Sequence, residues 1–177
     1  MTDAYIIDAV RTPRGIGKPG KGALSHLHPQ HLAATVLKAL KERNNINTAE
    51  DDDIIWSTST QKGKQGGDLG RMAALDAGYD VKASGMTLDR FCGGGITSVN
   101  LAAAQIMSGM EDLLIAGGTE MMSYTTTMSA DEMAAGIKPM GMGSGNRHLQ
   151  AVHPQSHQGV CGDAIAAMEG ITRQDVD

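Results

Sequence analysis

Cys92 is the residue of this sequence with the clearest capacity for nucleophilic chemistry. It stands in TLDRFCGGGITSVNLAAAQIMSG, residues 87–109, where three glycines follow it and an apolar helical run comes next. Unpaired N–H groups and the positive end of the dipole at a helix start stabilise an anion. Because thiolate is the reactive form of cysteine, the stretch predicts a nucleophile that a carbonyl substrate can approach closely. A small buried cysteine in a tight turn gives the same pattern, so both interpretations stay open.

An alternation of strands and helices has to position this cysteine. Short β-branched or apolar runs predict strands, and apolar residues at helical spacing predict helices. The expected strands are residues 4–10, 53–59, 85–89 and 112–118, and the expected helices are residues 29–43, 69–77 and 93–108. This order predicts an α/β fold, a parallel-type sheet with right-handed crossover helices. Cys92 would then lie just after the third strand, where the third helix begins.

The sequence changes in character after residue 120. Six of the 12 methionines lie within residues 121–142, without a clean period. Residues 162–170 predict a helix. Thr172 begins a T-x-x-D pattern, typical of a helix start, a few residues before the last residue of the sequence. Because a helix is costly to nucleate, we expect the chain to be truncated there. We therefore divide it into an α/β domain, residues 1–120, and an irregular, α-rich loop-domain excursion, residues 121–177.

Several other stretches offer weaker hypotheses. GIGKPGKG, residues 15–22, matches a phosphate loop as far as Lys21, and a nucleotide-binding module is kept as an alternative. Gly22 replaces the Ser or Thr that would ligate Mg²⁺, and no helix is expected there. Cys161 is interpreted as a packing residue, and the acidic residues 50–53 as a solvated turn. Three histidines lie near a helix start without a thiolate or carboxylate beside them, and we predict no metal site there: His26, His28 and His31.

Composition and charge argue against several classes of function. The net charge of −5 disfavours nucleic acid as a partner, because neutralising phosphates requires a basic surface. Two cysteines are too few for a disulfide scaffold and fit a reducing compartment. The first ten residues lack the charged start and long apolar core of a signal peptide, and no apolar stretch reaches membrane-spanning length. We therefore expect a cytoplasmic protein without membrane attachment.

Four stretches together resemble the amino-terminal half of the thiolase family. They are VRTPRG (10–15), GGDLGRMAALDAGY (66–79), DRFCGGGITSVNLAAAQIMSG (89–109) and AGGTEMMS (116–123), and AIAAMEGIT (164–172) is close to the family pattern too. The resemblance implies acyl transfer between coenzyme A thioesters and a cysteine, in the condensing or the cleaving direction, within fatty acid metabolism. Cys92 would be the acylated nucleophile, and its own backbone N–H would donate to the oxyanion.

The resemblance also implies what the rest of such a protein supplies. In thiolases a related carboxyl half carries a histidine that activates the nucleophile and a second cysteine that handles the α-proton. We therefore expect this chain to be inactive alone, and the complete protein to be a homodimer or tetramer. No cofactor is implied, because the coenzyme A thioester is itself the substrate. A non-catalytic, thiolase-like protein that binds acyl-CoA is the alternative.

A second region of interest is HPQSHQG, residues 153–159. Many thiolases carry a His, an apolar residue and a Gly there, which line the pantetheine and acyl pocket. The resemblance therefore assigns substrate binding to His157, Gln158 and Gly159. Gln158 departs from the methionine commonly found at its position, which leaves the acyl-chain preference open. A solvent-exposed loop histidine is the alternative for His157.

Overall fold

The computed structural model describes residues 3–138 and 142–177 of the chain. The described residues form two compact units, one reaching to Ala130 and the other running from Asp131 to Asp177. The boundary falls within helix α4, Met122–Ala134, so a continuous helix leads from the first unit into the second.

A three-stranded parallel sheet forms the centre of the first unit. Its strands are β1 (Asp53–Ser57), β2 (Met86–Leu88) and β3 (Leu114–Gly118), in the spatial order β2-β1-β3. The central strand sets the register, because Ile55 pairs with Met86 on one side and with Ala116 on the other. The predicted parallel α/β fold and three of its four expected strands are confirmed.

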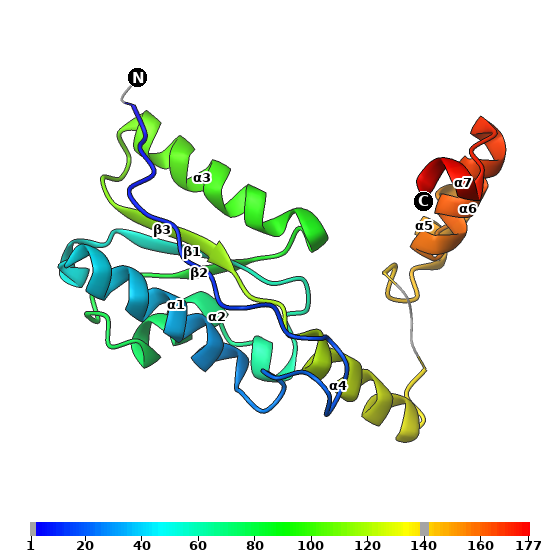
Figure 1. The fold of residues 1–177 in the computed structure, drawn as a ribbon, viewed down its shortest axis with the longest axis horizontal. Helices are drawn as coiled ribbons and strands as arrows, with labels where there is room; N and C mark the ends of the chain where they lie inside the picture. Colours follow the sequence, from blue (N-terminus) through cyan, green and yellow to red (C-terminus); the bar gives the residue numbers. More distant parts are fainter. Residues whose placement is uncertain (1–2, 139–141) are drawn as a thin grey trace. The chain divides into compact units, whose positions relative to one another are not determined.

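Helices cover both faces of this sheet (Figure 1). Helices α1 (Pro29–Asn44) and α2 (Leu69–Asp76) lie on one face, and α3 (Gly94–Ser108) lies on the other. Successive strand residues point to opposite faces, so β1 supplies both cores. Its Ile54 and Trp56 pack with α1 and α2 in one apolar cluster. That cluster contains these buried residues: Ala33, Ala34, Leu37, Ile54, Trp56, Leu69, Ala73, Ala74, Ala77, Tyr79, Ala83 and Ile115.

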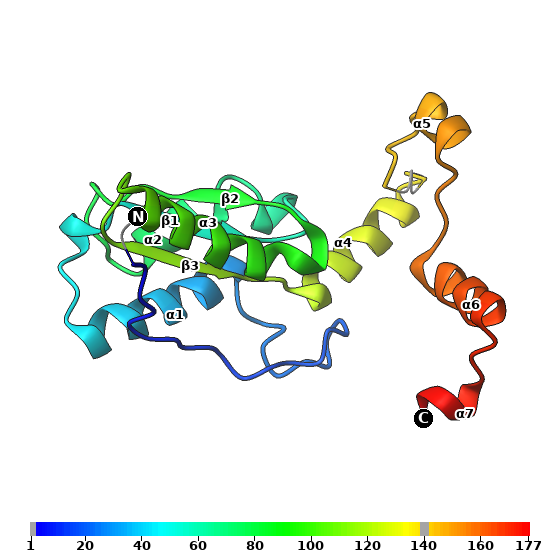
Figure 2. The same cartoon turned by 90° about the horizontal axis from the view of Figure 1, so that it is seen from above.

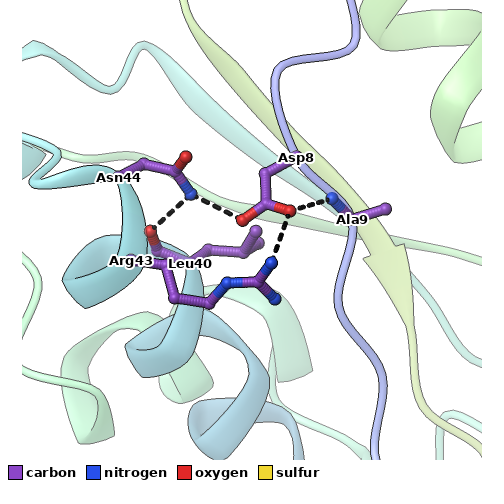
Figure 3. A network of polar contacts seen from close by, with 5 residues as sticks. All are labelled: Asp8, Ala9, Leu40, Arg43 and Asn44. Atoms are coloured by element: carbon purple, nitrogen blue, oxygen red, sulfur yellow. Dashed lines mark hydrogen bonds and ion pairs between the residues drawn. The ribbon is translucent and has the colours of Figure 1, made fainter.

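The prediction of a strand over residues 4–10 is wrong. These residues are extended but make no strand pairing, and they run past β3 (Figures 1 and 2). Asp8 ties them to the end of α1 instead, through Arg43 and Asn44 (Figure 3). A strand needs a partner for its backbone groups. The free edge of β3 faces a cavity of about 1280 Å³ instead, and residues 3–17 line this cavity without pairing with β3.

Helices dominate the chain after β3. The sequence between residues 121 and 142 showed no period, yet α4 forms there with Ser123 as its buried residue. Pro139, Met140 and Gly141, which belong to this methionine-rich stretch, lie outside the described residues. The second unit contains α5 (Arg147–Val152), α6 (Gln158–Glu169) and α7 (Arg173–Val176), none of which has a buried residue.

The two helix starts expected near the end of the chain both exist. Helix α6 begins at Gln158, four residues earlier than expected. Thr172 and Asp175 form a reciprocal capping box at the start of α7, as the T-x-x-D pattern predicts. Within the described residues, no helix is long and apolar enough to cross a membrane.

Candidate active site

Cys92 lies in a tight turn that joins β2 to α3. The turn is a short 3-10 helix, Phe91–Gly93, and α3 begins at the next residue. The side chain of Cys92 is exposed, so the interpretation as a buried structural cysteine is wrong. The exposed sulfur at the start of a 15-residue helix has the placement that a nucleophile requires.

Three local features make the turn sharp. The carboxylate of Asp89 accepts a hydrogen bond of 2.8 Å from the N–H of Phe91. Phe91 has a φ of 45°, in the left-handed region that side chains other than glycine rarely adopt. The N–H of Gly93 then bonds back to the carbonyl of Arg90 at 3.0 Å. Such a conformation persists only where the surroundings hold it, and it is common beside reactive groups.

The three glycines after Cys92 have different roles. A Cβ on Gly94 would lie 1.7 Å from Ser57 Oγ, because α3 presses directly on the end of β1. A Cβ on Gly95 would meet nothing within 4 Å, and one on Gly93 would meet only the side chain of Arg90, at 3.7 Å. Gly94 is therefore required by packing, whereas Gly93 and Gly95 leave open space beside the cysteine.

A polar cluster lies beyond the carboxyl ends of β1 and β3. We call Thr58, Ser59, Gln65 and Glu120 the strand-end cluster. The Glu120 carboxylate accepts hydrogen bonds from the other three side chains, and Thr58 and Gln65 are buried. Burial acts to raise the pKa of Glu120, but the hydrogen bonds from Ser59, Gln65 and Thr58 outweigh it and hold that pKa below its usual value.

Sequence reasoning assigned no role to the strand-end cluster. Glu120 was part of a motif that carried the family resemblance, and Thr58 and Ser59 were the last two residues of an expected strand. A usable signal was present, since polar residues that follow neighbouring parallel strands meet at one edge of the sheet. Gln65, by contrast, ends a short 3-10 helix, Gly63–Gln65, which the sequence analysis did not predict.

The predicted substrate-binding residues belong to the second unit, whereas Cys92 belongs to the first. His157 is the N-cap of α6, and its Nδ1 accepts a hydrogen bond of 3.1 Å from the N–H of Gly159. Gln158 is the first residue of that helix. His157, Gln158 and Gly159 are all exposed. Cys161, in the same helix, is exposed too, so its interpretation as a packing residue is wrong.

The phosphate-loop alternative finds no support in the structure. No helix begins in the residues directly after Lys21, because α1 starts only at Pro29. The loop is also closed on itself, since a Cβ on Gly22 would lie 2.3 Å from the carbonyl oxygen of Ile16. A phosphate loop needs a helix whose first N–H groups face the ligand.

Two of the three clustered histidines have contacts that explain them without a metal. His28 Nδ1 caps α1 by accepting a bond from the N–H of Gln30, and His31 lies 2.9 Å from an Asp76 carboxylate oxygen. Across the described parts of the chain, no group of three or more His, Cys, Asp or Glu side chains could hold a metal ion.

The interpretation of residues 50–53 as a solvated turn is wrong for one residue, Asp51. Its side chain is buried, and neither carboxylate oxygen has a hydrogen-bond partner. Burial, followed by the charges of Asp53, Asp52 and Glu111, raises its pKa to about 7. The turn leads directly into the central strand, whose first residues are already covered, and this explains why an acidic stretch contains a buried member.

Comparison with known proteins gives the chain its relatives. Residues 4–177 match the family model described as thiolase, N-terminal domain. A steroid 3-ketoacyl-CoA thiolase of Mycobacterium tuberculosis is 42% identical over 130 residues, which are 73% of this chain and 31% of that protein. A β-ketoadipyl-CoA thiolase of Acinetobacter baylyi is 35% identical over 185 residues, covering 100% of this chain and 45% of the relative.

A solved structure agrees with these sequence matches. The crystal structure of the Bacillus anthracis acetyl-CoA acetyltransferase superposes with a TM-score of 0.53 at 33% identity, over 58% of this chain and 25% of that one. The chain therefore spans less than half the length of each of these relatives.

Proposed function

The chain belongs to the thiolase family, and from this premise we propose that it is the amino-terminal part of an acyl-CoA acyltransferase with Cys92 as nucleophile. The observation that carries the proposal is the exposed thiol of Cys92 in a sharp turn at the start of α3. The names of the relatives, among them 3-ketoacyl-CoA thiolases, agree with a substrate class of acyl-CoA thioesters.

The proposed reaction proceeds through an acyl-enzyme. The Cys92 thiolate adds to the thioester carbonyl carbon, and the negative charge moves to the carbonyl oxygen, where the Cys92 N–H donates to it. The carbon–sulfur bond to coenzyme A then breaks, and the coenzyme A thiolate takes up a proton. In condensation, the α-carbanion of a second acyl-CoA attacks the acyl group and Cys92 leaves as thiolate. In cleavage, the Cys92 thiolate adds to the 3-keto carbon of a 3-ketoacyl-CoA, the bond between C2 and C3 breaks, and the leaving carbanion takes up a proton and departs as acetyl-CoA. The thiolate of a second coenzyme A then attacks the acyl group, and Cys92 leaves as thiolate.

The remaining machinery is proposed to come from a carboxyl part, as in the longer relatives. That part would supply a histidine as general base and a second cysteine for the α-proton. It would also fill the apolar cavity beside β3, whose free strand edge offers unpaired backbone groups. A homodimer or tetramer in the cytoplasm completes the proposal.

The second unit is proposed to contribute to acyl-CoA binding through His157, Gln158 and Gly159. Support comes from the position of these residues at the start of α6, where His157 and the backbone N–H of Gly159 are already engaged with each other. An acyl chain or pantetheine arm would contact the exposed surface of this helix start.

Mass spectrometry of the protein together with its carboxyl part, after brief exposure to acetyl-CoA, tests the proposal. We expect one acetyl group, mapped to the Cys92 peptide and absent in Cys92→Ala, once a carboxyl part is present. Cys161→Ala is the matched control and should be acetylated like wild type. Turnover that persists in Cys92→Ala would refute the nucleophile, and tight binding of acetyl-CoA without any adduct would favour the non-catalytic acyl-CoA-binding alternative.

A further inference from the structure

We propose that Glu120 is a positioning residue for Cys92, acting through the strand-end cluster that it shares with Thr58, Ser59 and Gln65. This inference rests on the proposed function only in taking Cys92 as the reactive group. Glu120 does not touch the cysteine. It holds the ends of the strands against which the Cys92 turn and the first turn of α3 are packed.

The Glu120 carboxylate is saturated with hydrogen bonds. Its Oε2 accepts from Thr58 Oγ1 at 2.9 Å, from the Ser59 N–H at 2.8 Å and from Ser59 Oγ at 2.8 Å. Its Oε1 accepts from Gln65 Nε2 at 3.2 Å. Because the acceptor is ionised, these bonds are stronger than bonds between neutral groups. One side chain that follows β3 thus fixes the two residues that follow β1.

Gln65 extends the cluster to a third segment. Its Nε2 also lies 3.1 Å from Thr58 Oγ1 and 3.0 Å from the Thr60 carbonyl oxygen, so its two hydrogens are shared among three acceptors, and its Oε1 accepts from the Met121 N–H at 2.7 Å. Gln65 is fully buried, so each of these bonds replaces a lost bond to water. The end of β1, the loop that holds Gln65 and the approach to α4 are joined around one carboxylate.

Two contacts transmit this arrangement to the cysteine. The Thr58 N–H donates to the Leu88 carbonyl at 3.1 Å, and Leu88 is the last residue of β2 before the Cys92 turn. Ser57, next to Thr58, meets the backbone of Gly94 on the other side of that turn. Both ends of the segment that contains Cys92 therefore rest on residues 57 and 58, and Glu120 bonds to Thr58 and to Ser59 directly after them.

A glutamine at position 120 cannot reproduce these bonds. If its oxygen takes the place of Oε2, its NH₂ group faces the NH₂ group of Gln65, and two donors oppose each other. Rotating the amide of Gln65 would relieve that conflict. It would also turn an oxygen toward the Thr60 carbonyl and remove the acceptor for the Met121 N–H. The cluster needs a carboxylate, not only a side chain of this shape.

The test is the alkylation rate of Cys92 by iodoacetamide in the 177-residue chain, followed by peptide mass spectrometry. Cys161, which is exposed in the second unit, serves as the internal standard in every sample. We expect Glu120→Gln and Thr58→Val each to lower the Cys92 rate at least threefold relative to Cys161. Thr58→Ser, which keeps the hydroxyl, should restore the wild-type ratio. Glu42→Gln removes the same negative charge as Glu120→Gln but at an exposed position on α1, and it should leave the ratio unchanged.

An unchanged ratio in Thr58→Val and Glu120→Gln chains with wild-type circular dichroism would overturn the proposal. If Glu120→Gln does not fold, Thr58→Val against Thr58→Ser decides the matter, since they differ chiefly in the hydroxyl that bonds to Glu120. The alkylation assay needs no acyl-CoA. Failure of acetyl-CoA to acylate the wild-type protein in the presence of its carboxyl part would therefore refute the proposed function and leave this test intact.

Discussion

Gly94 and Ser57 are in such close contact that a methyl group on Gly94 would lie 1.7 Å from Ser57 Oγ and 2.9 Å from Ser57 Cβ. Rotation of the serine side chain can remove the first clash but not the second. The start of α3 is therefore seated on the end of the central strand at the shortest distance that the backbone permits. The Cys92 turn, which immediately precedes Gly94, depends on this contact for its position.

Gly94→Ala should lower the free energy of unfolding by about 1–3 kcal/mol, the usual cost of inserting a methyl group into a filled space. Gly95→Ala is the matched control, because its Cβ would meet nothing within 4 Å. Alanine favours a helix over glycine, so this control should raise stability by up to about 1 kcal/mol. Urea denaturation of both variants measures the difference, and equal effects would contradict the packing argument.

Asp51 makes stability depend on pH in an unusual direction. Its pKa is raised to about 7 in the folded chain, against an ordinary value of 3.8. Its contribution to stability is therefore fully present below pH 3.8 and is lost as the pH rises to about 7. Asp52, Asp53, Glu111 and the ring of Tyr79 share its surroundings, and none of them neutralises its charge.

Asp51→Asn should therefore stabilise the chain at pH 8 by about 1–3 kcal/mol, because it removes a buried charge without a partner. The gain should shrink as the pH falls toward 5. Asp52→Asn should lower stability at pH 8, because backbone bonds from Asp112 and Leu113 lower the pKa of Asp52 and favour its charged form. This loss should stay constant down to pH 5, because Asp52 remains charged over that whole range. Urea denaturation across this pH range compares them, and parallel pH profiles would contradict the assignment.

Asp8 holds the extended amino-terminal segment in place (Figure 3). Its carboxylate accepts from Asn44 Nδ2 at 2.8 Å and from Arg43 at 3.1 Å, and hydrogen bonding to Asn44 lowers its pKa. Asp8→Ala should speed tryptic cleavage after Arg14 severalfold, because the segment makes no strand bonds that would keep it docked. Asp3→Ala, an exposed change on the same segment, should not alter the rate. A rate in Asp8→Ala equal to wild type would show that other contacts dock the segment.

His157 offers a way to separate helix capping from substrate binding. His157→Ala removes the N-cap of α6 and should destabilise that helix by about 0.5–2 kcal/mol, seen as faster amide exchange in residues 158–162. His157→Asn should keep the cap. If the asparagine variant keeps slow exchange but binds acyl-CoA more weakly, His157 contacts the ligand. Unchanged affinity in His157→Asn would limit the residue to capping.

Local sequence determined much of this protein. The β-branched run of β1, the start of α2 at Leu69 and the capping box at Thr172 involve neighbours in the chain, and each was predicted correctly. The glycines after Cys92 likewise indicated a turn into a helix. Such features depend on backbone geometry and on bonds within a few residues, so the sequence carries them without knowledge of the fold.

Tertiary structure decided the rest. Residues 4–10 have the composition of a strand but not its bonds, because pairing depends on where the edge of β3 lies. Asp51 is acidic like its neighbours, yet only the packing of the central strand buries it. Gln65 and Glu120 are 55 positions apart and meet only because parallel strands end at the same edge of the sheet. In each case the deciding partner is distant in the chain, and the free energy of the contact exists only once the fold has formed.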